Sequence, residues 1–426
     1  MERNDPRYQA YVEILKEELI PAMGCTEPIA LAYAAAKARE VLGVLPDSVQ
    51  LQVSGSIIKN VKSVIVPNTG HLKGMEAAAA AGIIAGSAEK ELEVIAEVST
   101  DKQAAIRDYL QTVPISIEHI EQGHVFDIIV TERCGDAWAK VRIADFHTNI
   151  CLIEKDGKVL YEKPLADEAA QESSRADRSL LNMKDIWEFA ETADLRDVAD
   201  LLERQIRYNN AIAEEGLLGD YGANIGRVLL STYGNDVSIR AKAKAAAGSD
   251  ARMNGCELPV IINSGSGNQG ITCSVPLIEY AKELHSGKEK LYRALIISNL
   301  VAIHEKTGIG TLSAYCGAVS AGAGAGAGIV YLCGDGYQAA IHTVVNALAI
   351  VSGIVCDGAK ASCAAKIASS VDAALLGYNM YKCNQEFKGG DGIVMKDIET
   401  TIKGIGRLGK DGMRQTNEEI IRLMMS

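Results

Sequence analysis

The sequence predicts an α+β protein, with a mostly α-helical C-terminal domain and a smaller inserted α+β sheet module. Strand-like segments rich in Val and Ile gather in the first half of the chain, and apolar residues recur at helical spacing elsewhere. Aromatic residues make up only 5% of the 426 residues, while there are 40 glycines, which indicates closely packed elements with cores of Ala, Ile, Leu and Val. We therefore expect an N-terminal helical hairpin at 1–46 packed on the C-terminal domain, an α+β module at 47–165 and a helical catalytic domain at 166–426.

The N-terminal hairpin is predicted from two helical segments around a short turn. Apolar residues at 8–20 follow helical spacing, with Glu and Lys between them. A second helix is expected at 28–41, because proline is well tolerated in a first helical turn. The turn between the two helices contains Cys25.

The α+β module is predicted from short segments bounded by Gly, Asp and Asn. Its expected strands lie at 49–54, 94–99, 115–120, 125–131, 138–143 and 149–153, and its expected helices at 74–86 and 102–110. The Asp156-Gly157 pair predicts a hairpin turn. Strands grouped with a few helices are typical of an α+β arrangement.

The C-terminal half loses the strand pattern. Charged sequence at 167–178 indicates a linker or an exposed helix, and the Ala/Gly tract at 321–328 is of low complexity. The tract resembles a dinucleotide-binding loop only superficially, because no clear strand precedes it and no suitably placed acid follows. Helices are expected at 180–191, 195–217, 224–230, 276–284, 290–306, 336–353 and 359–376.

Charge and cysteine content restrict the partners. A net charge of -12 argues against nucleic acid or an anionic membrane, because either would need a positive face. We expect a small molecule as the partner; the family resemblance given below implies that it is an amino acid, and we also expect a homodimer. The charged N-terminal sequence lacks the apolar segment of a signal peptide, which predicts a cytoplasmic protein. Ten cysteines in a reducing compartment are then expected to be free, catalytic or metal-binding.

Cys316, Cys356 and Cys363 lie in sequence poor in bulky side chains. Something other than side-chain volume must fill part of the space there, and we interpret it as an iron-sulfur cluster. Thiolates suit iron, and three of them leave one iron open for a substrate. The spacing alone is weak evidence, since a buried cysteine can also be a small hydrophobe. A structural zinc site would usually present closer pairs or four ligands.

Two polar segments are candidate substrate-binding loops. The first precedes a predicted helix, and its backbone N–H groups and hydroxyls could hold a carboxylate or phosphate, although a flexible turn is the alternative. It contains Ser264, Gly265, Ser266, Gly267 and Asn268. The second could equally be an ordinary connection, and contains Lys59, Asn60, Asn68 and Thr69.

Cys25 and two histidines are candidates for proton transfer. Cys25 comes just before the helix expected at 28–41, and the positive end of a helix lowers a thiol pKa, which suits a nucleophile or a base. An inert thiol is the alternative. His304 and His147 could each act as an acid or base, or serve only as hydrogen-bonded structure.

Four motifs resemble the L-cysteine desulfidase family, a branch of the iron-sulfur serine dehydratase alpha-chain superfamily. They are Gly24-Cys25-Thr26-Glu27-Pro28, Ser264-Gly265-Ser266-Gly267-Asn268-Gln269-Gly270, Tyr315-Cys316-Gly317 and Cys356-Asp357-Gly358-Ala359-Lys360. The resemblance spans most of the chain. It implies a [4Fe-4S] cluster held by Cys316, Cys356 and Cys363, with Cys25 as the proton acceptor. Cys273 and Cys333 do not match ligand positions.

The resemblance implies a carbon-sulfur lyase that converts L-cysteine to pyruvate, ammonia and hydrogen sulfide. An L-serine dehydratase acting by the same β-elimination is the close alternative. A pyridoxal-phosphate lyase is a further alternative, because the 266–270 segment resembles the asparagine loop of such enzymes. Its Schiff-base lysine would have to be Lys242 or Lys244, which lack the characteristic segment. A cysteine- or metal-responsive binding protein is the non-enzyme alternative.

Overall fold

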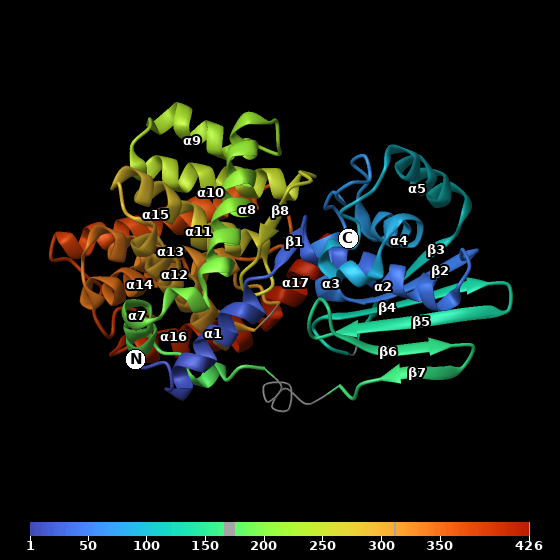
Figure 1. Ribbon diagram of the computed structural model, residues 1–426, viewed down its shortest axis with the longest axis horizontal. Coiled ribbons are helices and arrows are strands. Elements are labelled where there is room, and N and C mark those ends of the chain that lie inside the picture. Colours follow the sequence, from blue (N-terminus) through green and yellow to red (C-terminus); the bar gives the residue numbers. More distant parts are fainter. Residues whose placement is uncertain (122, 166–174, 311, 426) are drawn as a thin grey trace.

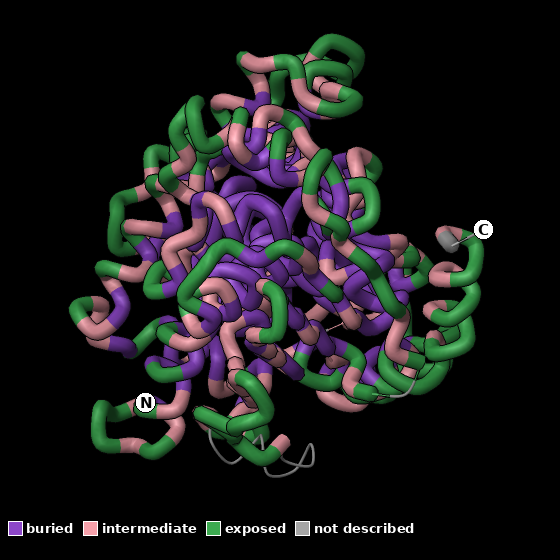
Figure 2. The backbone as a smooth tube through the Cα atoms, turned by 90° about the vertical axis from the view of Figure 1, so that its right-hand side faces the viewer, coloured by how far each residue is buried: buried purple, intermediate pink, exposed green. Residues whose placement is uncertain are grey.

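The computed structural model describes residues 1–121, 123–165, 175–310 and 312–425. These residues form a mostly helical α+β protein, which confirms the predicted fold class. Figure 1 shows a helical part on one side and a twisted sheet with its own helices on the other. Figure 2 shows that buried backbone gathers in the interior, with exposed segments around it. The boundaries at 46 and 165 stay a prediction, and most of the linker expected at 167–178 lies outside the described residues.

The sheet has six strands in the order β3-β2-β4-β5-β6-β7. The β2–β3 pair is parallel, and the other neighbouring pairs are antiparallel. Helix α2 (Thr26–Leu42) packs on β4 and β5, and α4 (Gly74–Ala85) packs on α2. The strands are β2 (Ser48–Ser54), β3 (Ile115–Ile120), β4 (Asp127–Cys134), β5 (Ala137–Ala144), β6 (Ile150–Lys155) and β7 (Lys158–Glu162).

Two differences from the predicted sheet have simple causes. The strand expected at 94–99 is wrong: this segment follows the 3-10 helix η1 (Ala88–Glu93), and its apolar residues are buried without joining the sheet. Strand β7 was missed because all its residues are exposed, so no alternation of apolar and polar positions marks it. The hairpin at Asp156-Gly157 is confirmed, since it joins β6 to β7 with both residues at positive φ.

The remaining helices build the helical part and cover the sheet. The sequence analysis missed α3, α10, α13, α16 and α17. Helix α17 returns to the sheet part and packs against α3. The helices are α1 (Pro6–Glu18), α3 (Gly55–Val61), α5 (Thr100–Thr112), α7 (Met183–Thr192), α8 (Ala199–Leu218), α9 (Ile225–Tyr233), α10 (Val237–Met253), α11 (Gly267–Glu283), α12 (Lys288–Ile309), α13 (Gly317–Cys333), α14 (Tyr337–Val351), α15 (Cys363–Lys382), α16 (Ile398–Arg407) and α17 (Arg414–Met425). Among the described helices, none is both long and apolar enough to cross a bilayer.

Helix α13 contains the Ala/Gly tract and lies between α12 on one side and α14 and α15 on the other. Residues two apart on a helix point in nearly opposite directions, because each residue turns the helix by about 100°. A Cβ on Gly322 would meet Ser370 of α15, whereas one on Gly324 would meet Ser298 of α12. The alternating glycines therefore let neighbours approach the backbone of α13 from both sides.

Gly324→Ala is expected to destabilise the protein by about 1–3 kcal/mol through overpacking. The new Cβ would lie 2.4 Å from the carbonyl oxygen of Ser298, which belongs to a buried helix backbone that has little room to move. Alanine would otherwise favour a helix interior over glycine by about 1 kcal/mol. Urea unfolding measures the difference. Gly336→Ala is the control, because no atom lies within 4 Å of its added Cβ, and equal losses in both variants would contradict the argument.

Candidate active site

A cavity of about 110 Å³ lies where the helical part meets the sheet part. It is lined from several elements that are distant in the sequence. The lining includes Cys25, Glu27, Lys59, Asn60, His147, Arg252, Ser264, Gly265, Ser266, Asn268, Gln269, Lys306, Cys316, Gly317, Cys356, Gly358 and Cys363. Most of the candidate residues from the sequence analysis are therefore brought to one place.

A two-stranded sheet joins Cys25 to the Ser264–Asn268 segment. Strand β1 (Pro21–Met23), directly before Cys25, pairs with β8 (Pro259–Ile261), directly before that segment. Thr26 Oγ1 then donates to the carbonyl oxygen of Gly265 at 3.0 Å. Neither short strand has a recognisable sequence pattern, so the sequence analysis did not find this connection.

The Ser264–Asn268 segment is a tight turn followed directly by a helix. Ser264 and Gly265 have left-handed backbones, with φ of 49° and 76°, and Asn263 bridges to Ser266. Helix α11 begins at Gly267, earlier than the predicted start at 276. Gly267 and Asn268 therefore belong to the first helical turn, where backbone N–H groups have no helical acceptor.

The three candidate metal ligands line the same cavity as Cys25. Cys316 is the residue before α13, and Cys363 is the first residue of α15. Cys356 lies on a segment that pairs with the one before α13: its N–H donates to Ala314 at 2.6 Å, and the N–H of Cys316 donates to Ile354 at 3.2 Å. Pairing of two connections, rather than proximity in sequence, brings Cys316 and Cys356 together.

Thiolates are the ligands that hold iron-sulfur clusters, and three thiols line this cavity. In the part of the chain that the structure describes, no three His, Cys, Asp or Glu side chains are placed to hold one metal ion. The three thiols instead stand around a hollow, and a cluster takes its thiolates on separate iron atoms. Burial and the neighbouring Cys356 raise the pKa of Cys316 to about 12, and burial raises the pKa of Cys363 to about 11. These thiols stay protonated until a metal displaces the protons.

Two lysines place positive charge beside these thiols. Lys59 Nζ donates to the carbonyl oxygen of Cys356 at 3.3 Å and to Asn417 Oδ1 of α17 at 2.7 Å. Burial lowers the pKa of Lys59, and burial lowers the pKa of Lys306 to about 8, while the charges of Cys356 and Cys316 oppose both changes. Their cations would favour an anionic group held by the thiols.

Cys25 belongs to a hydrogen-bonded group centred on Glu27. The Cys25 thiol donates to Glu27 Oε2 at 3.0 Å, and Asn60 Nδ2 donates to Glu27 Oε1 at 3.0 Å. His147 Nε2 lies 3.9 Å from the same Oε1 atom and has no hydrogen-bond partner among the described residues. A thiol, a carboxylate and an imidazole therefore line one wall of the cavity.

The pKa of Cys25 is raised in the structure, whereas the sequence analysis expected a helix start to lower it. Burial raises it well above the ordinary value, and the charge of Glu27 adds to the rise, while Arg252 opposes it. Burial alone would raise the pKa of Glu27 as well, but His147 and the Cys25 hydrogen bond lower it to about 2. The proton shared by this pair thus stays on Cys25, and the helix start does not by itself make a thiolate.

Glu27→Gln is expected to lower stability at pH 7 and to lose this deficit in acid. The folded pKa of Glu27, about 2, lies below its ordinary value of 4.5. Its stabilisation is therefore fully present above about pH 5 and is lost as the pH falls towards 2, with a size on the order of 3 kcal/mol. Urea unfolding of both proteins at pH 7 and pH 3 measures the change. An equal deficit at both pH values would contradict it.

Glu132→Gln is the matched control, and its expected effect on stability at pH 7 has the opposite sign. Glu132 is buried on β4, its carboxylate oxygens lack partners among the described residues, and burial raises its pKa to about 9. A raised carboxyl pKa costs stability as the pH rises from about 4.5 towards 9. Glutamine cannot ionise, so this variant should be at least as stable as the wild type at pH 7.

Four candidate residues do not line the cavity: Asn68, Thr69, His304 and Gly267, the last of which lies between the lining residues Ser266 and Asn268. Asn68 donates to the carbonyl oxygens of Ile95 and Ala96, and Thr69 donates to Val66. His304 bonds to Glu399 on α16 at 2.8 Å. These side chains hold local structure. Lys59 and Asn60 do line the cavity, but they lie on helix α3 rather than on the predicted loop.

Arg252, Gln269 and Lys306 are among the cavity residues that were absent from the predicted site. Arg252 lies in the last turn of α10, Gln269 in the first turn of α11 and Lys306 near the end of α12. Gln269 stands within the Ser264–Gly270 motif, so its position was a usable signal. Arg252 ends an Ala-rich helix far from any motif, and only the fold brings it to the cavity.

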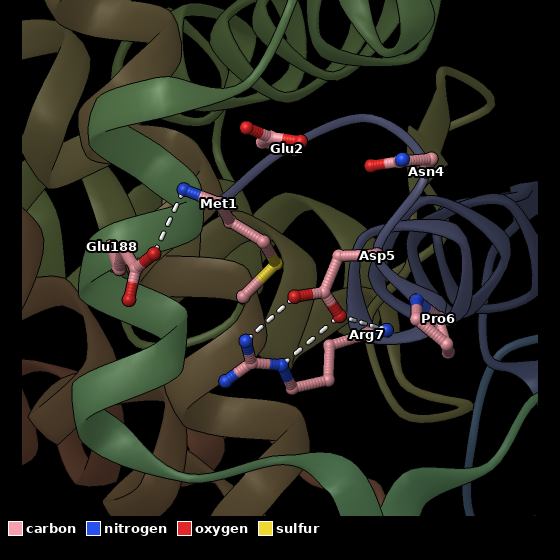
Figure 3. Close-up of a pocket in the computed structure, with 7 residues that line it drawn as sticks. All are labelled: Met1, Glu2, Asn4, Asp5, Pro6, Arg7 and Glu188. Carbon is pink, nitrogen blue, oxygen red and sulfur yellow. Dashed lines mark hydrogen bonds and ion pairs between the residues drawn. The ribbon is translucent and has the colours of Figure 1, made fainter.

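A second hollow lies at the N-terminal turn and is distinct from the cavity (Figure 3). Its charged groups are paired with one another. The Met1 ammonium lies 2.8 Å from Glu188, and Arg7 pairs with Asp5 at 2.6 Å and with Asp185 at 3.0 Å. We do not assign a site there.

The mostly helical α+β fold contains a thiol-lined cavity, and the family to which the chain belongs assigns it a lyase-like role. The chain belongs to the serine dehydratase alpha chain family, whose model matches residues 74–422. It is similar over its full length to a UPF0597 protein of Desulfitobacterium hafniense, with 62% identity across 100% of this chain and 99% of that protein. UPF0597 proteins of Lachnoclostridium phytofermentans and Treponema denticola are 52% and 46% identical, across 98% and 100% of this chain and 100% of each relative.

Proposed function

We propose that this protein is a carbon-sulfur lyase of the L-cysteine desulfidase type, converting L-cysteine and water to pyruvate, ammonia and hydrogen sulfide. The observation that carries the proposal is the shared cavity, which is lined by Cys25 and the Ser264–Asn268 turn together with Cys316, Cys356 and Cys363. Membership of the serine dehydratase alpha chain family supports β-elimination from a small amino acid.

The three cysteines would hold a [4Fe-4S] cluster. When bound, it would supply a Lewis acid for the leaving sulfur. Lys59 and Lys306 would compensate its negative charge. Gly317 and Gly358 line the same hollow, and a side chain on Gly358 would meet the backbone of Lys59 at 2.3 Å.

The turn at 264–268 and Cys25 would bind the amino acid and move its proton. The turn would hold the carboxylate through backbone N–H groups and hydroxyls. Cys25 would pass its thiol proton to the leaving sulfur and accept the Cα proton, so that the C–S bond breaks with loss of hydrogen sulfide. Glu27 would orient the Cys25 sulfur through the 3.0 Å hydrogen bond. The remaining enamine would tautomerise and hydrolyse in water to pyruvate and ammonia.

L-serine is the second candidate substrate, and the description of the matching family favours it. The elimination would be the same, with hydroxide in place of sulfide. A pyridoxal-phosphate reaction has less support. Lys242 and Lys244 lie on α10, where they pair with Asp372 at 2.6 Å and Glu279 at 2.8 Å, and neither lines the cavity.

Anaerobic reconstitution with iron and sulfide tests the proposal. We expect broad absorbance that a reductant bleaches, together with sulfide release from L-cysteine. Pyruvate formation mainly from L-serine would instead support the second candidate. A band shifted by amines would indicate pyridoxal phosphate, and tight cysteine binding without turnover would indicate a binding protein. We also propose a homodimer, which sedimentation velocity would test.

A further inference from the structure

Arg252 is a buried guanidinium without an ionic partner among the described residues. Only 3% of the residue is exposed. Its Nη1 donates to Asn268 Oδ1 at 3.2 Å, while its Nε has no hydrogen-bond partner. Asn268 is neutral, so the charge of the guanidinium is not balanced by this contact. A buried charge of this kind is costly unless an anion accompanies it.

The position of Arg252 indicates where that anion would lie. Arg252 lines the cavity beside the start of α11. A Cβ on Gly267 would lie 2.3 Å from Arg252 Nε, so glycine is needed for the guanidinium to reach the helix start. The first backbone N–H groups of a helix also attract anions. Arg252 and the first turn of α11 therefore present donors and positive charge to the same space.

The geometry points to a carboxylate-binding site formed by Arg252 and the first turn of α11, which restricts substrates to α-amino acids with a free carboxylate. The planar fork of a guanidinium matches the two oxygens of a carboxylate. The Thr26–Gly265 hydrogen bond ties this side of the cavity to Cys25. A carboxylate held there places the adjacent Cα near the proposed base. The identity of the reaction rests on the proposed function, but the binding site does not.

A different anion could account for Arg252, namely the ionised carboxylate of Glu27 or, once Cys25 loses its proton, the Cys25 thiolate, since the charges of both oppose the lowering of the Arg252 pKa by burial. The charge of Arg252 opposes the rise in the Cys25 pKa, so the two groups interact. The unpaired Nε beside Gly267 favours the carboxylate, because it lies at the helix start that attracts anions. The two roles differ in their effect on ligand affinity and on the reactivity of Cys25.

Calorimetric titration of the full-length protein with L-alanine and L-alaninamide tests the site. The two probes lack a leaving group and differ in the carboxylate, which is an uncharged amide in alaninamide. We expect the wild type to prefer L-alanine, and Arg252→Gln to weaken L-alanine binding by at least about 30-fold. Arg252→Lys should bind with intermediate affinity, since lysine keeps the charge but not the fork. Arg227→Gln, an exposed change on α9, should bind like the wild type.

Three results would overturn the carboxylate site. They are equal binding of the two probes by the wild type, absence of L-alanine binding, and unchanged L-alanine affinity in Arg252→Gln or Arg252→Lys. Slower alkylation of Cys25 with unchanged L-alanine affinity would assign Arg252 to the thiolate instead. Near-UV circular dichroism checks folding, and Arg252→Lys decides the question if Arg252→Gln does not fold. Arg252-dependent binding without turnover would count against the proposed reaction and leave this site standing.

Discussion

The Cys316→Ser, Cys356→Ser and Cys363→Ser proteins are each expected to lose the iron-sulfur absorbance of the reconstituted wild type. Serine keeps the shape of the side chain but replaces the soft sulfur ligand that iron prefers. Cys316 lies at the start of α13, Cys363 at the start of α15, and Cys356 on the segment that pairs with the residues before α13. Because the three thiols come from different elements, no single element can compensate for a lost ligand. Iron and sulfide content per chain, measured with the visible spectrum, would report the loss.

Cys333→Ser is the matched control for these variants. Cys333 is exposed at the opposite end of the helix that Cys316 precedes. Its replacement should leave the absorbance unchanged. A full cluster in any one of the three ligand variants would remove that cysteine from the ligand set, and turnover would then have to be explained without it.

Cys25→Ala is expected to reduce turnover by about 100-fold to 10,000-fold, the usual contribution of a general base. The cluster absorbance should be retained, because Cys25 lies in the wall that contains Glu27 rather than among the predicted ligands. Exchange of the Cα proton in heavy water should fall with turnover. The Glu27 hydrogen bond would be absent in this variant, so the pH dependence of stability should be measured beside the activity.

Normal proton exchange in Cys25→Ala would show that another group is the base. His147 and Glu27 would then be the next candidates, because both line the cavity. His304 is no longer among them, since it bonds to Glu399 on α16. Cys151→Ala, a buried thiol on β6, controls for general effects of removing a sulfur atom.

The sequence predicted the fold class well because its strongest signals are local. Helical spacing identified α1 and α2 within a few residues, and Asp156-Gly157 identified a hairpin. Elements without local contrast were missed. Strand β7 is exposed throughout, and α13 has no polar face that could reveal a helical period. Strand β7 is held by its neighbour β6 across the hairpin, whereas α13 is stabilised by the helices packed around it.

The same difference between local and tertiary signals decides which residues of the candidate site could be predicted. Cys25, Cys316 and the turn at Ser264 stand in recognisable motifs, and the structure brings them to one cavity. Asn68 shows that a polar residue between apolar segments can be used for structural hydrogen bonds, here to the backbone of Ile95 and Ala96 and to Met23 Sδ. Arg252 could not be predicted, because its importance depends on burial without an ionic partner, and burial of a helix end is set by tertiary packing.

The Ala/Gly tract of α13 is repetitive in sequence, yet helix geometry fixes its length. Adding one Ala-Gly unit would leave its composition almost unchanged. Two extra residues, however, would turn the downstream helix by about 200° and advance it by about 3 Å. Gly326 and Gly328, which now face α15 and α11, would be out of register with them. A Gly-to-Ala substitution in the tract thus crowds one contact. A change in tract length instead misaligns every contact of the helix beyond the insertion.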